Sequence, residues 1–464
     1  MGADFKLTES FKINGEWWRP SHPSTRLDGI LNYDPDSGLT LTVRGSFEDS
    51  RSLHYPLSNE NLILGLSDKS ENISLVNCLM TGSTGSTIAV GKEIGKGASN
   101  YSPQFLISGE HIENYSDLVI EYLECEMFNL DEWLCISGYT ITNDYEGKSF
   151  DVRYQLPEDL SFNVDDKVNG RFTFKNNVPP SSWYTKQIHT RQTTILKFTA
   201  TAGPLHLRSA LEYIYIFQSL LMLCIYESVH VVQVMYGTSN GRCAFIYNPS
   251  FSNFRKEELP VYDHFLPFSV IQDQFDGVIQ KWYELFRKVE PSISLFSEQF
   301  YRGRKFDSNI FLNLAQCVET FHSRISDKTQ LPKEEFKNRV EQIIESSPHE
   351  YKTWLRTKLN FANQATLQDR LDDLTNQFKL PIFGRIIDDL PTFTKSIKHS
   401  RNYFTHYSRK LDNKALKGRD LYLVSEKLRV ITACCFLIMS GVDKEALNAT
   451  VENILWRRFN HLLI

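Results

Sequence analysis

The spacing of apolar residues changes along this chain of 464 residues, and the change limits what the chain can fold into. Up to about residue 200 the spacing is close to two, as in Leu39, Leu41 and Val43. These residues follow a turn-forming segment, Asp34–Gly38, and such alternation is typical of half-buried strands. From about Val270 onward apolar residues recur every three or four positions, which is typical of amphipathic helices. The expected helices are 270–289, 308–325, 332–346, 350–361, 366–378, 391–412, 420–440 and 443–462.

This change of period predicts an α+β multidomain chain. Residues 1–200 are expected to form a β-rich sensing or regulatory domain, with further strands at 171–175 and 193–199. Residues 201–290 are expected to form a mixed α/β connecting part packed on the N-terminal domain. Residues 291–464 are expected to form an all-α helical bundle.

Three local patterns predict specific strands, turns and buried residues in the first half of the chain. Phe150–Leu156 alternates apolar and polar residues and predicts one more half-buried strand. Trp17 and Trp18 follow Asn14–Gly15, which predicts a turn and then two core tryptophans. The apolar run 210–226 is shorter than the ~20 residues that cross a bilayer, so it predicts a buried helix and no membrane span.

Charge and cysteine content narrow the function. The net charge of −5 is unevenly distributed, because residues 291–464 hold 27 Lys and Arg against 20 Asp and Glu. A basic C-terminal half is the part that would attract a polyanion. The eight cysteines include no C-x-x-C pair, so we expect free thiols and neither a metal site nor another cofactor. Free thiols and the lack of an apolar leader at the start predict a cytoplasmic protein.

The segment from Leu390 to Leu411 carries the most informative pattern. Its apolar residues form one stripe on a helical wheel. Arg401 lies at the border of that stripe, and His406 lies about 140° further round. Ten Lys and Arg lie between residues 395 and 429, the positive charge that phosphate binding requires. The residues predicted to contact RNA are Lys395, Lys398, His399, Arg409 and Lys410.

These residues also suggest a family. Arg401–His406, with polar Asn402 after the Arg, resembles the R-x(4–6)-H motif of HEPN domains. The N-terminal half, with Gly15–Trp18 and the hairpin 31–46, is similar to the N-terminal domain of ApeA-type anti-phage proteins. The resemblance implies a C-terminal HEPN-type bundle that acts as a ribonuclease in abortive infection. A phage-derived trigger would then act at the N-terminal domain.

The side chains suit RNA cleavage without a metal. His406 can act as general base or acid, because imidazole titrates near neutral pH. Arg401 presents a planar fork to phosphate oxygens, and Asn402 can orient His406 or bind phosphate. Attack by the ribose 2′-OH would leave a 2′,3′-cyclic phosphate and a 5′-OH. Glu319, three residues before His322 on an expected helix, is a further candidate for support, although a solvated helix face is the favoured interpretation of that pair.

The separation of Arg401 and His406 predicts a homodimer through the C-terminal domain, since one copy does not easily aim both at one phosphate. HEPN domains pair in this way. A tRNA anticodon loop is one plausible substrate, because unpaired bases can splay out. The alternative is a non-catalytic sensor that binds a ligand and docks nucleic acid through the basic helical domain.

Overall fold

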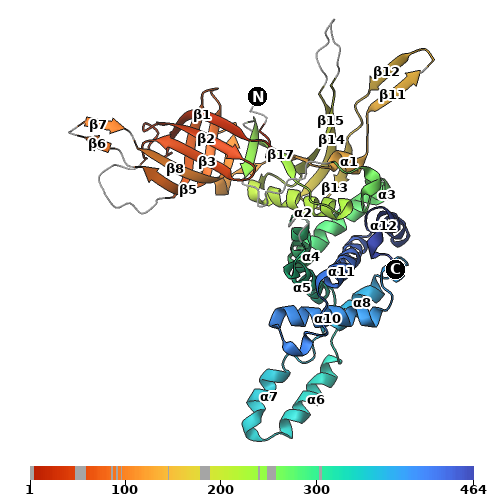
Figure 1. The fold of residues 1–464 in the computed structure, drawn as a ribbon. Helices are drawn as coiled ribbons and strands as arrows, with labels where there is room; N and C mark the ends of the chain where they lie inside the picture. Colours follow the sequence, from red (N-terminus) through yellow and green to blue (C-terminus); the bar gives the residue numbers. More distant parts are fainter. Residues whose placement is uncertain are drawn as a thin grey trace. The chain divides into compact units, whose positions relative to one another are not determined.

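The computed structural model describes residues 5–47, 59–84, 87–89, 92–95, 97–144, 146–177, 189–238, 241–247, 258–301 and 306–464. The chain divides into two units, Met1–Val261 and Tyr262–Ile464. Their boundary falls inside the predicted connecting part 201–290. The predicted α+β class is confirmed, because the first unit is β-rich and the second is helical (Figure 1).

Six antiparallel strands close into a barrel in the first unit. Their order is β8-β3-β2-β1-β4-β5, and β5 pairs again with β8, which closes the ring. Closure leaves these six strands without an open edge of their own. The strands are β1 Phe11–Trp18, β2 Leu27–Asp34, β3 Gly38–Arg44, β4 Glu60–Ser67, β5 Asn72–Thr84 and β8 Ala98–Ser108. Two short strands, β6 Thr87–Ala89 and β7 Lys92–Gly95, form a separate hairpin between β5 and β8.

Trp17 fills the barrel core, as the sequence predicts. The flanking strands make room for its ring, because a Cβ at Gly65 would lie 2.4 Å from it and a Cβ at Gly29 2.8 Å. The predicted turn at Asn14–Gly15 is wrong, since both residues lie inside β1. Gly15 serves close packing instead: a Cβ there would lie 2.3 Å from the carbonyl oxygen of Leu66.

A second part of the sheet continues from the barrel in the order β18-β17-β10-β15-β14-β13, and β18 pairs with β8. Helix α2, Leu207–Ile225, contacts strand β10 and is largely buried, as predicted. By length and composition alone α2 would also suffice to cross a membrane, a test that buried core helices pass too. The remaining elements of this part are β9 Val119–Ile120, β10 Tyr122–Met127, α1 Leu130–Leu134, β13 Leu160–Asn163, β14 Val168–Asn176, β15 Gln192–Ala200, β16 Leu205–His206, β17 Val231–Thr238 and β18 Gly241–Tyr247.

The strand predicted around Phe150 forms, but it is not half-buried. It is β12, Ser149–Tyr154, and the one strand it pairs with among the described residues is β11, Tyr139–Asp144. Ile141, Phe150 and Val152 of this two-stranded hairpin are exposed, whereas Tyr139 and Tyr154 are half-buried. Alternation predicts one apolar face, but it does not reveal whether another element covers that face.

The second unit is built from helices whose bounds lie close to those predicted. The expected break before Pro291 is a kink at Val289 inside α4, because proline removes one backbone donor and disturbs the preceding turn. The predicted helix 391–412 is too long, since α10 ends at His406 and Tyr407 adopts a left-handed conformation. The helices are α3 Phe268–Ile271, α4 Phe275–Tyr301, α5 Ser308–Ile325, α6 Lys333–Glu345, α7 Lys352–Leu359, α8 Leu367–Gln377, α9 Phe383–Ile386, α10 Leu390–His406, α11 Gly418–Met439 and α12 Lys444–Arg458.

Candidate active site

Helix α10 presents the Arg401–His406 segment, and its own sequence fixes both ends. Asp389 caps the start, where its carboxylate accepts a hydrogen bond from the backbone N–H of Thr392. Phe393, Ile397 and Ser400 form the buried face, as the apolar stripe predicts, but Tyr407, which belongs to the same stripe, is 66% exposed because the helix ends before it. The motif therefore occupies the last two turns of α10.

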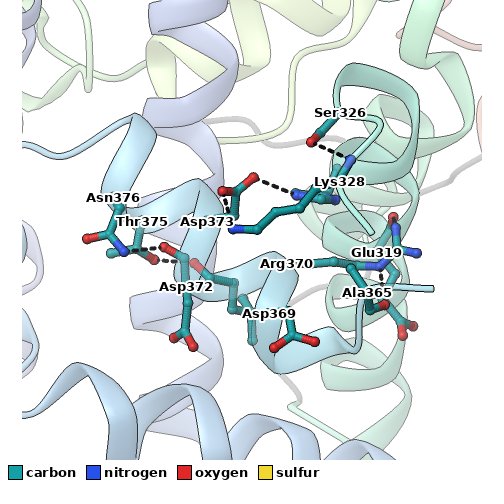
Figure 2. Close-up of polar contacts among 12 residues, drawn as sticks. Glu319, Ser326, Lys328, Ala365, Asp369, Arg370, Asp372, Asp373, Thr375 and Asn376 are labelled. Carbon is teal, nitrogen blue, oxygen red and sulfur yellow. Dashed lines mark hydrogen bonds and ion pairs between the residues drawn. The ribbon is translucent and has the colours of Figure 1, made fainter. Parts of the chain in front are cut away.

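Arg401 is held by an acidic residue of a neighbouring helix. Its Nη2 donates to Glu319 Oε2 of α5 at 3.0 Å, and its Nη1 lies 3.4 Å from Asn402 Oδ1. Both side chains of the ion pair are about one-third exposed or less, so solvent partly screens their attraction. Arg370 of α8 fixes the backbone beside Glu319, because its guanidinium donates to the carbonyl oxygens of Glu319 and Ala365 (Figure 2). The structure thus brings Arg401 and Glu319 together.

A pocket of about 1050 Å³ opens beside this ion pair, inside the second unit. Four cationic side chains contribute to its wall, against the carboxylates of Glu319 and Asp327. Charge of this sign suits a phosphate group. The charged and polar lining residues are Gln316, Glu319, Thr320, His322, Ser323, Ser326, Asp327, Lys328, Thr329, Lys333, Gln364, Thr366, Arg370, Arg401 and Thr405.

His322 lies in the wall of the pocket, one turn after Glu319 on α5. Its side chain is only 1% exposed, so the favoured interpretation of a solvated helix face is wrong for this residue. Its Nε2 lies 2.8 Å from Asp373 Oδ2. Lys328 donates to the other oxygen of that carboxylate at 2.6 Å (Figure 2). Burial lowers the pKa of His322 and outweighs the opposite effect of Asp373. A neutral imidazole that donates from Nε2 fits this geometry.

His406 is placed differently from Arg401. Its side chain is exposed, it does not line the pocket, and it makes no hydrogen bond within the described part of the chain. The structure therefore does not bring His406 and Arg401 to one point within a single copy. Asn402 lies against Arg401 rather than against the imidazole.

The predicted RNA-contacting residues also lie outside the pocket lining. Lys395, Arg409 and Lys410 are exposed, and the last two stand on a short 3₁₀ turn, Arg409–Leu411, after α10. Lys398 and His399 are half-buried, and burial together with Lys414, Lys395 and Lys398 lowers the pKa of His399. The segment after α10 folds back onto the helix, because the backbone N–H of Leu416 donates to the buried Ser400 hydroxyl at 2.9 Å.

Sequence reasoning passed over Arg370, Lys328 and Asp373. Arg370 and Asp373 lie on α8 and Lys328 follows α5, so no spacing in the sequence links them to Arg401. The one available signal was the Glu319–His322 pair at i and i+3. Over the described residues, no group of three or more His, Cys, Asp or Glu side chains is arranged to hold a metal ion.

Comparison with protein families agrees with this architecture. Residues 12–282 match ApeA N-terminal domain 1, and residues 312–446 match the Apea-like HEPN domain. Comparison with curated proteins and with solved structures finds no match. The second match contains Glu319, His322 and the whole Arg401–His406 segment, and a HEPN domain indicates a ribonuclease-type function. The first match alone spans more than half of the 464 residues, so the resemblance noted from the motif is confirmed and this chain belongs to the ApeA family.

Proposed function

We propose that this chain is a metal-independent endoribonuclease that acts in anti-phage defence. One observation supports the proposal most: the Apea-like HEPN match covers an Arg401–His406 segment whose arginine lines a basic pocket. Arg401 enters that pocket already oriented by Glu319. A guanidinium oriented in advance suits the negative charge that gathers on a phosphate during cleavage.

In the proposed reaction the ribose 2′-oxygen attacks phosphorus while the bond to the 5′-oxygen breaks. His406 takes the proton from the 2′-OH while water protonates the leaving 5′-oxygen, or His406 protonates the 5′-oxygen while water takes the proton from the 2′-OH. Arg401 binds the phosphoryl oxygens, and Asn402 supports this contact. The products are a 2′,3′-cyclic phosphate and a 5′-OH. The exposed residues Lys395, Arg409 and Lys410 and the half-buried Lys398 and His399 would bind the RNA backbone on either side of the cut.

The first experiment compares variants on total RNA with and without EDTA. We expect Arg401→Ala and His406→Ala to lose cleavage while EDTA leaves wild-type cleavage intact. Two matched controls are Arg385→Ala, from the ion pair with Glu452, and His461→Ala, at an exposed position outside the matched HEPN segment. Undiminished cleavage by either folded site variant contradicts the residue assignment. No cleavage by the wild type favours the alternative of a non-catalytic binding protein.

We further propose that the protein acts as a homodimer through its C-terminal unit. The proposal is supported by the exposed position of His406, which no other described side chain orients. In the dimer, Arg401 of one copy and His406 of the partner subunit would face one phosphate. Mixing inactive Arg401→Ala and His406→Ala chains should then restore partial activity, since one of the two sites regains both groups. A fully active monomer would contradict this arrangement.

We also propose a cytoplasmic defence role in which the β-rich unit detects a phage-derived component and controls the nuclease. Membership of the ApeA family supports this proposal. The test is to sequence RNA ends in cells before and after infection, with wild type and with His406→Ala. We expect new 2′,3′-cyclic ends after infection in wild-type cells only, and a tRNA anticodon loop is one candidate position. Equal cleavage without infection would exclude control by a trigger.

A further inference from the structure

Helices α6 and α7 form a helical hairpin that extends away from the rest of the C-terminal unit (Figure 1). The two ends of this hairpin are tied together at its base. Thr329 and Gln364 form a β-bridge, and the Asn363 side chain makes two hydrogen bonds to the backbone of Leu331, at 2.8 and 2.9 Å. The hairpin, residues 331–363, is thus a defined projection rather than an extended loop.

The hairpin exposes large aromatic side chains. Tyr351 is 52% exposed, Trp354 58% and Phe361 67%, and no residue of α7 is buried. Isolated exposed aromatics are ordinary, but three within eleven residues of one short projection form a surface. The packing of the described chain does not account for these aromatic side chains.

Basic residues alternate with these aromatics. Lys352, Arg356 and Lys358 lie on the same segment, and none of them forms an ion pair with any described acidic residue. Lys358 stands one helical turn after Trp354, so an ammonium group and an indole face share one side of α7. Exposed rings interleaved with unpaired cations match the two parts of a nucleotide, base and phosphate.

The base of the hairpin also forms part of the Arg401 pocket. Lys328, Lys333 and Gln364 line that pocket together with Arg401 and Glu319. Helix α6 has 13 residues, which corresponds to a length of about 20 Å. An RNA strand with one phosphate at Arg401 would therefore meet Lys333 at the start of α6, and it would reach the aromatic segment past the four glutamates of that helix.

We propose that the α6–α7 hairpin binds unpaired bases of the substrate RNA. Tyr351, Trp354 and Phe361 stack against the bases, and the neighbouring cations bind the backbone. The identity of the strand as RNA rests on the proposed function. Stacking on a side chain requires a free base face, so the hairpin selects single-stranded segments and loops over paired duplex.

The experiment measures binding by the full chain to a single-stranded RNA carrying 2′-O-methyl riboses, which offers no nucleophile for cleavage. We expect Trp354→Ala to weaken binding about tenfold and Trp354→Phe to retain most of it. The control is Trp456→Ala, because Trp456 is 55% exposed in the same unit but stacks with Arg385 on another face. A duplex of the same sequence should bind more weakly and respond little to Trp354→Ala.

A second measurement tests the cations. Replacing Lys352, Arg356 and Lys358 by Gln should flatten the dependence of log K on log salt by about 2, at roughly 0.7 for each phosphate contact. Equal binding by wild type and Trp354→Ala would overturn the inference. It would also be overturned if Trp354→Ala altered the oligomeric state in light scattering while RNA affinity stayed constant, because the face would then contact a second copy.

The outcome separates this inference from the proposed function. If the chain binds the modified strand through Trp354 but does not cleave unmodified RNA, the hairpin inference stands and the proposed nuclease function is wrong. If the chain cleaves RNA and Trp354→Ala does not alter the KM, the proposed nuclease function stands and the hairpin inference is wrong.

Discussion

The two ends of the Arg401–His406 segment have opposite surroundings. Arg401 lines a pocket, is partly shielded and has a fixed partner in Glu319. His406 stands at the last position of α10, exposed and without a hydrogen bond to any described residue. One copy of the chain therefore orients Arg401 and leaves His406 exposed, so under the proposed mechanism the substrate or a second copy would orient the imidazole. The predictions below test this contrast, from the largest expected effect to the smallest.

The largest effect is expected when position 401 keeps a positive charge but no longer carries a planar guanidinium. Arg401→Lys should lower kcat by about 10²–10³, because an ammonium group cannot bind both Glu319 and a phosphate in the same planar geometry. Cleavage rates on a defined RNA measure this. Arg385→Lys, at the ion pair with Glu452, is the matched control and should retain the wild-type rate. Near-normal activity of Arg401→Lys would show that charge alone suffices.

Glu319 is expected to act through Arg401. Glu319→Gln should lower kcat by about tenfold to a hundredfold with little change in KM, since the guanidinium remains present but is less well oriented. In a double-mutant cycle, adding Glu319→Gln to Arg401→Ala should cost nothing more. Additive losses would mean that Glu319 contacts the substrate itself.

The free energy of unfolding of the chain is expected to decrease in acid because of His322 in the pocket wall. Burial lowers the pKa of His322 in the folded chain, so the unfolded chain binds a proton first as pH falls. Stability should be complete above about pH 6.5 and decrease below it. Asp373 adds a later loss, below about pH 3.9, because hydrogen bonds from Lys328 and His322 outweigh burial and lower its pKa.

Calorimetry of the full chain between pH 7.5 and 5.5 measures the first loss, with Tm falling about 2–4 °C for each kcal/mol lost. His322→Gln keeps a donor for Asp373 but does not titrate, so its Tm should fall less. His349→Gln, at an exposed position, should follow the wild type. Equal pH slopes for wild type and His322→Gln would exclude His322 as the titrating group.

The smallest effect is expected on the open side of α10. Lys395→Ala and Arg409→Ala should each raise KM about two- to fivefold and reduce the salt slope by about 0.7, as for the loss of one phosphate contact. Lys379→Ala, an exposed lysine beyond α8, is the control. If neither change alters KM, the RNA does not pass over the side of the helix that carries His406.

Sequence reasoning predicted the helical unit well because its signals are local. The apolar periodicity and the capping residue Asp389 define α10 within a few positions. The end at His406 was missed, since Tyr407 leaves the helix in a left-handed conformation that favours glycine or asparagine. No local sequence pattern predicts that a tyrosine adopts this conformation.

The barrel and the pocket contain long-range pairings that the sequence alone does not predict. Strands such as β3 could be predicted individually, but ring closure depends on the pairing of β5 with β8, which no periodicity encodes. Trp17 was expected in the core, yet Gly29 and Gly65, which make room for its ring, come from two other strands. The ion pair between Arg401 and Glu319 likewise joins residues 82 positions apart.

The tie between Thr329 and Gln364 has an evolutionary consequence. Because it closes the base of the helical hairpin, the 33 residues from 331 to 363 form a cassette whose entry and exit points are adjacent. A cassette of this kind can lengthen, shorten or change its surface without displacing α5, α8 or α10. The length and surface of the hairpin can therefore change while the ion pair between Arg401 and Glu319 beside the pocket stays in place.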